Sequence, residues 1–323
     1  MRRAANRWQD PVVLVTPMPG ADRRHVLDLL YGQGTIISNH HGNPGGYLDW
    51  AMETARLLRN QIQRSDIDRL VLTPQLSQLR NMLDVHPRVV NPVLDMEITE
   101  RSELFDLARR TLKAEIDRWD SRPGLLVVVD TSVFMSHPNK IRDIDYAAEL
   151  GRDFDDIRLV LPLVVVDELD RLKESGANDR RWRAGHTLGV LDELLRNRRA
   201  VARLRSADNF RAVAEAGGMP RGEVTVEVFF DQPGHVRMAE ADDEIVDRAC
   251  AIQALAGRRV RLLTMDTSMS MRARMADLEV HKIARDIGPE PQPPVLKAEK
   301  DARRGNARRD NGSAAAATAG EHA

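Results

Sequence analysis

The chain has 323 residues, of which 42% are hydrophobic and 30% charged, and its formal net charge is −1 at pH 7. This length allows two domains with their own cores, and the composition excludes collagen-like and low-complexity classes. Because the net charge is near zero, the whole chain does not attract nucleic acid, and any such binding has to use a local basic patch.

Cysteine usage and the longest apolar runs bear on the compartment. Cys250 is the only cysteine, which excludes an intramolecular disulfide and a cysteine-based zinc cluster and favours a reducing compartment. Arg2 and Arg3 are followed only by the short apolar run 12–15, and the longest apolar stretch, 159–166, is too short to span a bilayer. We therefore expect a cytoplasmic protein that is neither exported nor inserted in a membrane.

Residues 1–120 begin with a segment that contains several Gly and Pro residues and then show helical periodicity. The first apolar stripe consists of Leu48, Met52, Ala55, Leu58 and Ile62, and the second of Leu104, Leu107, Ala108, Leu112, Ile116 and Trp119. Apolar residues three and four positions apart line one face of a helix. The sequence predicts a mainly helical domain of unknown role, whose helices are also compatible with a homo-oligomer.

The segment 121–124, which contains Pro and Gly, interrupts this helical pattern. After it, apolar strand-like runs alternate with segments of helical periodicity. The predicted strands are 125–129, 158–161, 224–229, 259–263 and 278–283. This alternation predicts an α/β domain with a parallel sheet between helical layers, over residues 125–288. Residues 289–323 are rich in Pro, Ala, Gly and charge, and we expect a disordered tail that is either a solvated terminus or a weak RNA tether.

Acidic residues stand at the ends or beginnings of these elements. Asp-Thr-Ser occurs twice, at Asp130 and Asp266, each time directly after an apolar strand. Glu168 lies on the helix that follows the strand reaching Pro162, and Asp242 opens a later helix. Because ligands bind at the carboxyl ends of strands in open α/β sheets, we expect these side chains to converge.

Each acid taken alone is also explained as a helix N-cap or an exposed helix residue. That explanation does not account for all four acids at one sheet edge, because two unit charges about 4 Å apart repel by roughly 4 kcal/mol at an effective dielectric near 20. Several carboxylates at one sheet edge therefore need protons or a cation. Oxygen ligands suit Mg²⁺ or Mn²⁺.

Four acids of this chain resemble, in order and in position, those of the PIN domain family of metal-dependent nucleases: Asp130, Glu168, Asp242 and Asp266. The segments PLVVVDELDRLK and LLTMDTSMSMRAR are most similar to the longer PIN domains attached to PhoH-type ATPases, although the chain has no Walker A motif. The resemblance covers about residues 125–285. It implies a PIN-like three-layer fold and leaves open whether Asp242 or Asp243 is the third acid.

The resemblance also implies a function. It predicts a divalent-metal-dependent endoribonuclease in which the four acids are catalytic and hold Mg²⁺ or Mn²⁺, leaving a 5′-phosphate and a 3′-hydroxyl. RNA is favoured over DNA on the resemblance alone. The predicted substrate contacts are a basic group just beyond Glu168: Arg171, Lys173, Arg180, Arg181 and Arg183. Trp182, inside this group, is interpreted either as a stacking surface for the substrate or as a residue packed inward, and inward packing is favoured.

Three alternatives accompany this prediction. Asp266, Ser268 and Ser270 spell the Asp-x-Ser-x-Ser of metal-dependent adhesion modules, but too late in the chain for that fold. A haloacid dehalogenase-type phosphatase needs a second acid where Ser132 stands. A catalytically inactive PIN-fold protein that binds RNA or acts as a scaffold stays open, as do the substrate sequence and a toxin or RNA-processing role.

Overall fold

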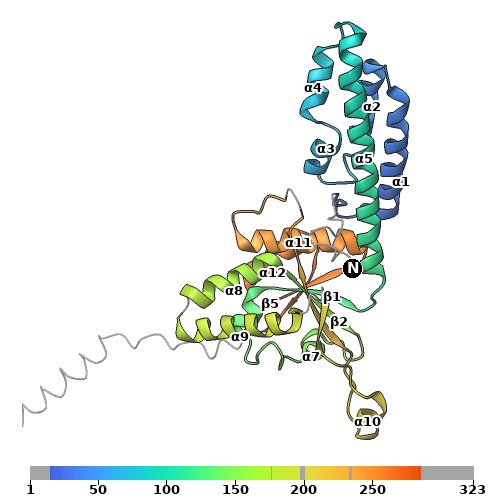
Figure 1. The fold of residues 1–323 in the computed structure, drawn as a ribbon. Coiled ribbons are helices and arrows are strands. Elements are labelled where there is room, and N and C mark those ends of the chain that lie inside the picture. The colour runs from blue at the N-terminus through green and yellow to red at the C-terminus, as the bar shows by residue number, and fades with distance from the viewer. Residues whose placement is uncertain (1–14, 176, 197–200, 233–234, 285–323) are drawn as a thin grey trace, which may run out of the picture. The chain divides into compact units, whose positions relative to one another are not determined.

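The computed structural model describes residues 15–175, 177–196, 201–232 and 235–284 (Figure 1). The predicted tail at 289–323 lies outside the described residues. The first part is helical, as predicted. Its elements are α1 (Arg23–Ile36), the 3-10 helix η2 (Ile37–His40), α2 (Pro44–Leu58), α3 (Arg64–Leu70), α4 (Pro74–Asn81) and α5 (Pro87–Asp120).

Helix α5 is the longest helix among the described residues, at 34 residues, and its periodicity explains its position. Pro87 occupies the first turn, where a missing N–H does no harm, and the His86 side chain accepts a hydrogen bond from Arg88 N at 3.2 Å. Phe105, Leu112 and Trp119 recur at seven-residue spacing and are fully buried. The predicted stripe is therefore largely the buried face, although Leu107 is 38% exposed.

The stripe predicted along α2 is only partly correct, because Leu58 and Ile62 are fully buried but the rest of the buried face lies elsewhere on the helix. Met52 is 69% exposed, whereas Tyr47, Trp50 and Thr54 are buried. The buried face includes a polar residue because the Thr54 hydroxyl lies 2.8 Å from Gln33 Oε1 and donates to it. A pattern of apolar residues alone could not identify that face.

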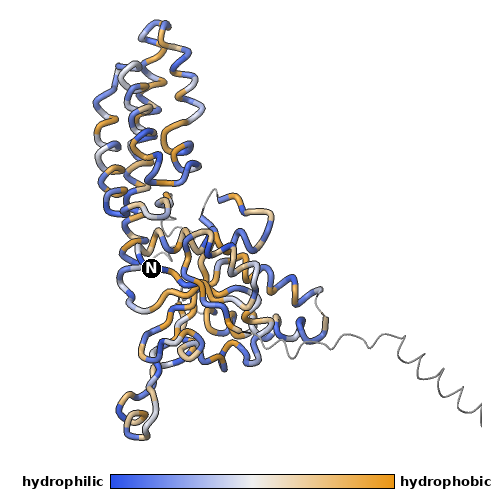
Figure 2. Tube along the Cα trace, turned by 180° about the vertical axis from the view of Figure 1, so that it is seen from behind, coloured by the Kyte–Doolittle hydropathy of each residue, from blue (hydrophilic) through white to orange (hydrophobic). Residues whose placement is uncertain are grey.

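The second part contains one six-stranded sheet in the described residues. Its strands are β1 (Leu125–Val129), β2 (Ile157–Pro162), β3 (Val201–Arg205), β4 (Val224–Phe229), β5 (Val260–Thr264) and β6 (Glu279–Lys282). The strand order is β3-β4-β2-β1-β5-β6, and only the β3–β4 pair is antiparallel. This confirms the predicted α/β class with a mostly parallel sheet. The hydrophobic residues of this part concentrate in its strands (Figure 2).

The predicted strands coincide with five of these six, within one residue at each end. β3 was not predicted, because Val201–Arg205 is a short edge strand that carries Arg203 and Arg205. Edge strands often carry such charges, and its pairing with β4 is set by the sheet rather than by its own pattern.

The connections place the helices on two faces. The helices of the second part are α6 (Thr131–Ser136), α7 (Tyr146–Leu150), α8 (Leu163–Ser175), α9 (Asn178–Leu195), α10 (Phe210–Glu215), α11 (Ala241–Ala256) and α12 (Thr267–Met275). From β1 the chain moves through β2 to β4 in one direction, then returns across the sheet to β5. Right-handed crossovers therefore put α11 on the face opposite α7, as Figure 1 shows.

The reversal of direction creates a switch point between the neighbouring strands β1 and β5. The chain leaves β1 toward one edge of the sheet and leaves β5 toward the other. At such a point the connecting segments diverge and leave room at the carboxyl ends of the strands. Asp130 directly follows β1, and Asp266 lies two residues beyond the end of β5.

Between α5 and β1 the chain turns at Gly124, with a φ of +108°. A Cβ atom there would lie 2.7 Å from the Asp156 carbonyl oxygen, so the turn requires glycine. This confines the start of β1 and thereby the position of Asp130 at its end.

A buried ion-pair group joins α5 to the sheet. Glu227 on β4 accepts from Arg158 Nη2 on β2 at 3.0 Å and from Arg118 Nη1 on α5 at 2.8 Å. The Arg158 and Glu227 side chains are each 4% exposed.

Among the described residues, no helix is both long and apolar enough to cross a membrane.

Candidate metal and active site

The two Asp-Thr-Ser copies lie side by side, one after β1 and one after β5. The Asp130 side chain is nearly buried, and its Oδ2 accepts from Ser132 Oγ at 2.5 Å and from Thr264 Oγ1 at 2.7 Å. The Ser132 hydroxyl oxygen also accepts from Met265 N at 3.0 Å. The second copy is thus tied to the first through these two hydroxyl groups.

Asp266 and Glu168 are held in the same region. Asp266 caps α12, accepting from Met269 N at 3.1 Å, and its own N–H donates to Thr264 Oγ1 at 2.9 Å. Glu168, on α8, accepts from Thr131 Oγ1 at 2.6 Å. Thr131 directly follows Asp130, so this bond draws the α8 acid toward the end of β1.

The carboxylates lie close enough to influence one another's protonation. Burial raises the pKa of Asp130 above its ordinary 3.8, and the charge of Asp266 raises it further, against the hydrogen bonds from Ser132 and Thr264. The pKa of Glu168 is raised by burial, with Asp130 and Asp242 adding to the rise. The four acids predicted from the sequence, which come from four different elements, are therefore electrostatically coupled.

Asp242 belongs to this group through its charge. Burial raises the pKa of Asp242, and the charges of Asp130 and Asp266 raise it further. Asp243, its neighbour in the first turn of α11, instead pairs with Arg272 Nη1 on α12. Arg272 Nε lies 4.0 Å from Asp242 Oδ2. Asp242 is thus electrostatically coupled to Asp130 and Asp266, whereas Asp243 is paired with Arg272.

Arg272 was not singled out by the sequence. Its only signal is its position, six residues beyond Asp266, on a helix that starts at the acid group. It partly offsets the charge of Asp242 and Asp243.

The donor set fits a divalent cation. Asp130, Glu168, Asp242 and Asp266 supply only hard oxygen ligands, which Mg²⁺ and Mn²⁺ prefer. Burial raises the pKa of three of them, and the charges of neighbouring acids in the group add to the rise. Asp130 and Glu168 are fixed by hydroxyl donors, in the manner of ligating carboxylates that are themselves hydrogen-bonded.

A second group of ligand-type side chains lies in the segment before α11. Ligand atoms of Asp231, His235 and Glu244 lie within 4.8 Å of one another. However, Arg237 Nε already donates to Asp231 at 2.6 Å, and Arg248 Nε lies 3.4 Å from Glu244. Each carboxylate thus already has an arginine beside it, and His235 Nε2 lies 2.7 Å from Glu244 Oε1.

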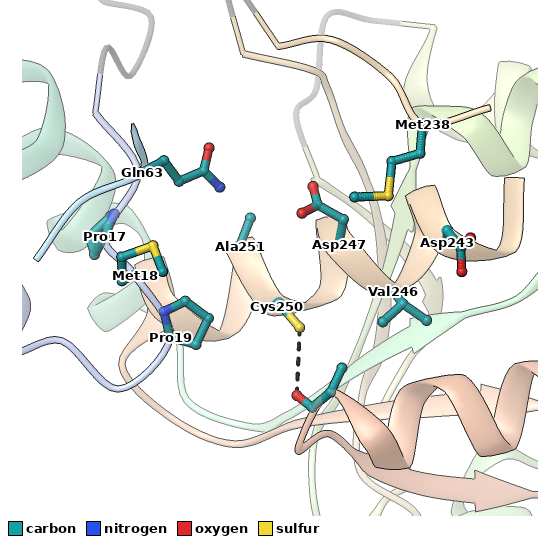
Figure 3. A pocket seen from close by; sticks show the side chains of 11 residues that line it. Pro17, Met18, Pro19, Gln63, Met238, Asp243, Val246, Asp247, Cys250 and Ala251 are labelled. Atoms are coloured by element: carbon teal, nitrogen blue, oxygen red, sulfur yellow. Dashed lines mark hydrogen bonds between the residues drawn. The ribbon is translucent and has the colours of Figure 1, made fainter. Parts of the chain in front are cut away.

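A pocket of about 580 Å³ lies beside α11 (Figure 3). Pro17, Met18 and Pro19 face Cys250 and Ala251 across it. Burial, with the charges of Asp247 and Asp277, raises the pKa of Cys250 to about 11, so its thiol stays protonated. The pocket touches the acid region only through Asp243 and does not include the four acids.

The predicted substrate residues lie on α8 and α9, which pack against each other. Arg171, Lys173, Arg180 and Arg181 are exposed. Arg183 is different, because its guanidinium donates to the carbonyl oxygens of Phe134, His137 and Pro138 at 3.2, 2.7 and 3.0 Å. Trp182 is 53% exposed, so its interpretation as packed inward was wrong.

Fold and acid group together define a mostly parallel α/β domain with a carboxylate-lined switch point. The sequence model of the PIN domain family matches residues 127–284, and the second part of the chain is therefore a PIN domain. PIN domains are typically nucleases. The match does not extend to a PhoH-type ATPase association.

Comparison with other proteins adds little to this. No curated protein matches the chain. A solved structure, a domain of a functionally unknown protein from Methanocaldococcus jannaschii DSM 2661, is 20% identical and covers 53% of this chain and 99% of its own, with a TM-score of 0.30. A similarity at that level supports no functional assignment.

Proposed function

We propose that the chain is a divalent-metal-dependent endoribonuclease whose site is Asp130, Glu168, Asp242 and Asp266. The observation that supports the proposal is a set of hydrogen bonds, in which Thr264 joins Asp130 to the main chain of Asp266 and Thr131 holds Glu168, while Asp242 is electrostatically coupled to Asp130 and Asp266. Isolated N-caps would not be expected to meet in this way. A cytoplasmic location, as the single cysteine favours, suits an enzyme acting on cellular RNA.

Each part of the site has a distinct role in this proposal. Asp130 and Asp266 would bind the cation directly. Glu168 and Asp242 would either bind it as well or position water molecules around it. Bound Mg²⁺ or Mn²⁺ supplies Lewis-acid chemistry, lowering the pKa of a water and offsetting charge on the phosphodiester. Ser132, Thr264 and Thr131 keep the carboxylates oriented by donating to them.

Positive charge for the substrate is available on the α8–α9 pair. Within the part of the chain that the structure describes, Arg171, Lys173 and Arg180 form no ion pair, whereas arginines such as Arg118 and Arg237 are paired with carboxylates. Unneutralised cations on the same helix as Glu168 suit the phosphates of a nucleic acid strand. Arg183, which holds main-chain carbonyls, is assigned a positioning role instead.

The test is cleavage of a fluorophore–quencher single-stranded RNA in Mg²⁺ or Mn²⁺ and in EDTA. We expect metal-dependent cleavage that falls about 100-fold or more in Asp130→Asn and in Asp266→Asn. Asp170→Asn is the matched control, because Asp170 is exposed on α8 two residues beyond Glu168, and it should cleave normally.

Two results would contradict the proposal. One is full activity in both site variants despite a native circular dichroism spectrum. The other is RNA binding without any metal-dependent cleavage by the wild-type chain, which would favour the inactive RNA-binding alternative.

A further inference from the structure

Trp182 stands apart from the other tryptophans in the described residues. Trp50 is 4% exposed and Trp119 fully buried, whereas Trp182 is 53% exposed on α9. An exposed indole leaves a large apolar face in water, and such faces are common at binding sites. Trp182 also lies between Arg181 and Arg183, inside the basic group of α8 and α9.

The Trp182 ring is held in a defined orientation. The His186 ring, one helical turn later, stacks on it with centroids 5.2 Å apart and an interplanar angle of 9°. Lys140 Nζ lies 5.0 Å from the Trp182 ring centroid. Because both neighbours already restrict the indole, a ligand that stacks on it loses less freedom on binding.

Arg183 connects this arrangement to the acid group. By donating to the carbonyls of Phe134, His137 and Pro138, it fastens the end of α6 and the segment leading to Lys140 onto α9. The other end of α6 begins at Thr131, beside Asp130. At 1.5 Å per residue, this six-residue helix is about 9 Å long.

We propose that Trp182, with His186 and Lys140, is a stacking platform for an unpaired nucleobase, so that the substrate is engaged as a single strand. This inference rests on the proposed function for its choice of nucleic acid as the ligand. Lys140, whose Nζ lies over the ring, and the neighbouring α9 residues Arg180 and Arg181 are exposed cations that complement phosphates. A duplex hides the faces of its bases, so only an unpaired base can stack on this indole.

The test measures binding separately from cleavage. Fluorescence anisotropy follows a labelled oligouridine RNA and a labelled RNA duplex of similar length, in EDTA, where metal-dependent cleavage does not occur. We expect Trp182→Ala to weaken single-strand binding at least about fivefold, which is the loss of one base–aromatic stack, and to leave duplex binding unchanged. Trp182→Phe should retain most of the affinity.

Phe210→Ala is the matched control, because Phe210 is 65% exposed on α10, outside the basic group, and should bind like the wild type. The proposal is overturned if Trp182→Ala binds the single strand normally, if single-strand and duplex binding fall equally, or if the wild type binds no single strand, which would point to a protein partner for the indole. If Trp182→Ala weakens single-strand binding but the wild-type chain never cleaves RNA, the stacking platform is supported and only the nuclease activity is refuted.

Discussion

At the scale of single residues, Asp130 has the most constrained environment in the acid group. It is 4% exposed, it accepts two hydroxyl hydrogen bonds, and it lies near Asp266. A carboxylate in such a place is poorly stabilised when it is ionised without a cation. The fold therefore holds Asp130 at a cost in stability, as functional sites often do.

This leads to a prediction on stability and pH. Because the folded-state pKa of Asp130 is raised, folding favours the protonated form of this side chain. The resulting stabilisation is fully present below the ordinary pKa of 3.8 and is lost as pH rises through the folded-state pKa. In EDTA at pH 7, Asp130→Asn should raise the free energy of unfolding by about 1–2 kcal/mol, measured by urea denaturation. The gain should shrink below pH 4 and reverse with saturating Mn²⁺, which stabilises only the wild type.

Asp170→Asn should change the free energy of unfolding little under any of these conditions, since Asp170 is exposed. An Asp130→Asn variant that is less stable than the wild type in EDTA at pH 7 would show that the charge is already compensated within the protein.

The acids of the proposed site could be singled out from the sequence because they follow or begin strongly patterned elements. Asp130 and Asp266 end apolar strands, and the sequence indicates both strands and both acids. Arg272 and the fastening role of Arg183 were not predictable, because each depends on residues far away in the chain. The exposure of Trp182 was missed because a lone tryptophan in a helix is usually buried, and sequence shows no more than its neighbours' charge.

At the scale of elements, the central strands were the most predictable features. β1 and β2 are buried on both faces, which requires the continuous apolar runs that the sequence shows. The amphipathic helix α2 was harder, because its buried face includes Tyr47 and Thr54 while Met52 faces outward. Its orientation is decided by hydrogen bonding to Gln33 and packing against α1, which local periodicity does not encode.

A second prediction concerns the junction of β2, β4 and α5. Glu227→Ala leaves Arg158 buried without its carboxylate, and should lower the free energy of unfolding by about 3–5 kcal/mol. The control is Glu215→Ala, whose partner Arg211 is exposed, and which should change stability by no more than about 0.5 kcal/mol. Urea denaturation measures both. A loss below about 1 kcal/mol for Glu227→Ala would mean that water compensates Arg158.

At the scale of the whole chain, the helical first part meets the PIN domain at several places. Arg23 Nη1 donates to the Leu255 carbonyl at the end of α11 at 2.9 Å, and Arg118 reaches Glu227 on β4. The sequence predicted both parts but no contacts between them, because such contacts join single residues rather than patterned segments. Helix α11, which carries Asp242 in its first turn, is thus held at its far end by the first part.

The central claim is that Asp130, Glu168, Asp242 and Asp266 together hold one or more divalent cations. A crystal of the full chain soaked in Mn²⁺ tests it most directly, through anomalous density. We predict a peak between the two Asp-Thr-Ser turns, with carboxylate oxygens of Asp130 and Asp266 at bonding distance, and no such peak in Asp130→Asn. Fully ordered carboxylates without a peak there, or Mn²⁺ bound instead at Asp231, His235 and Glu244, would contradict the claim.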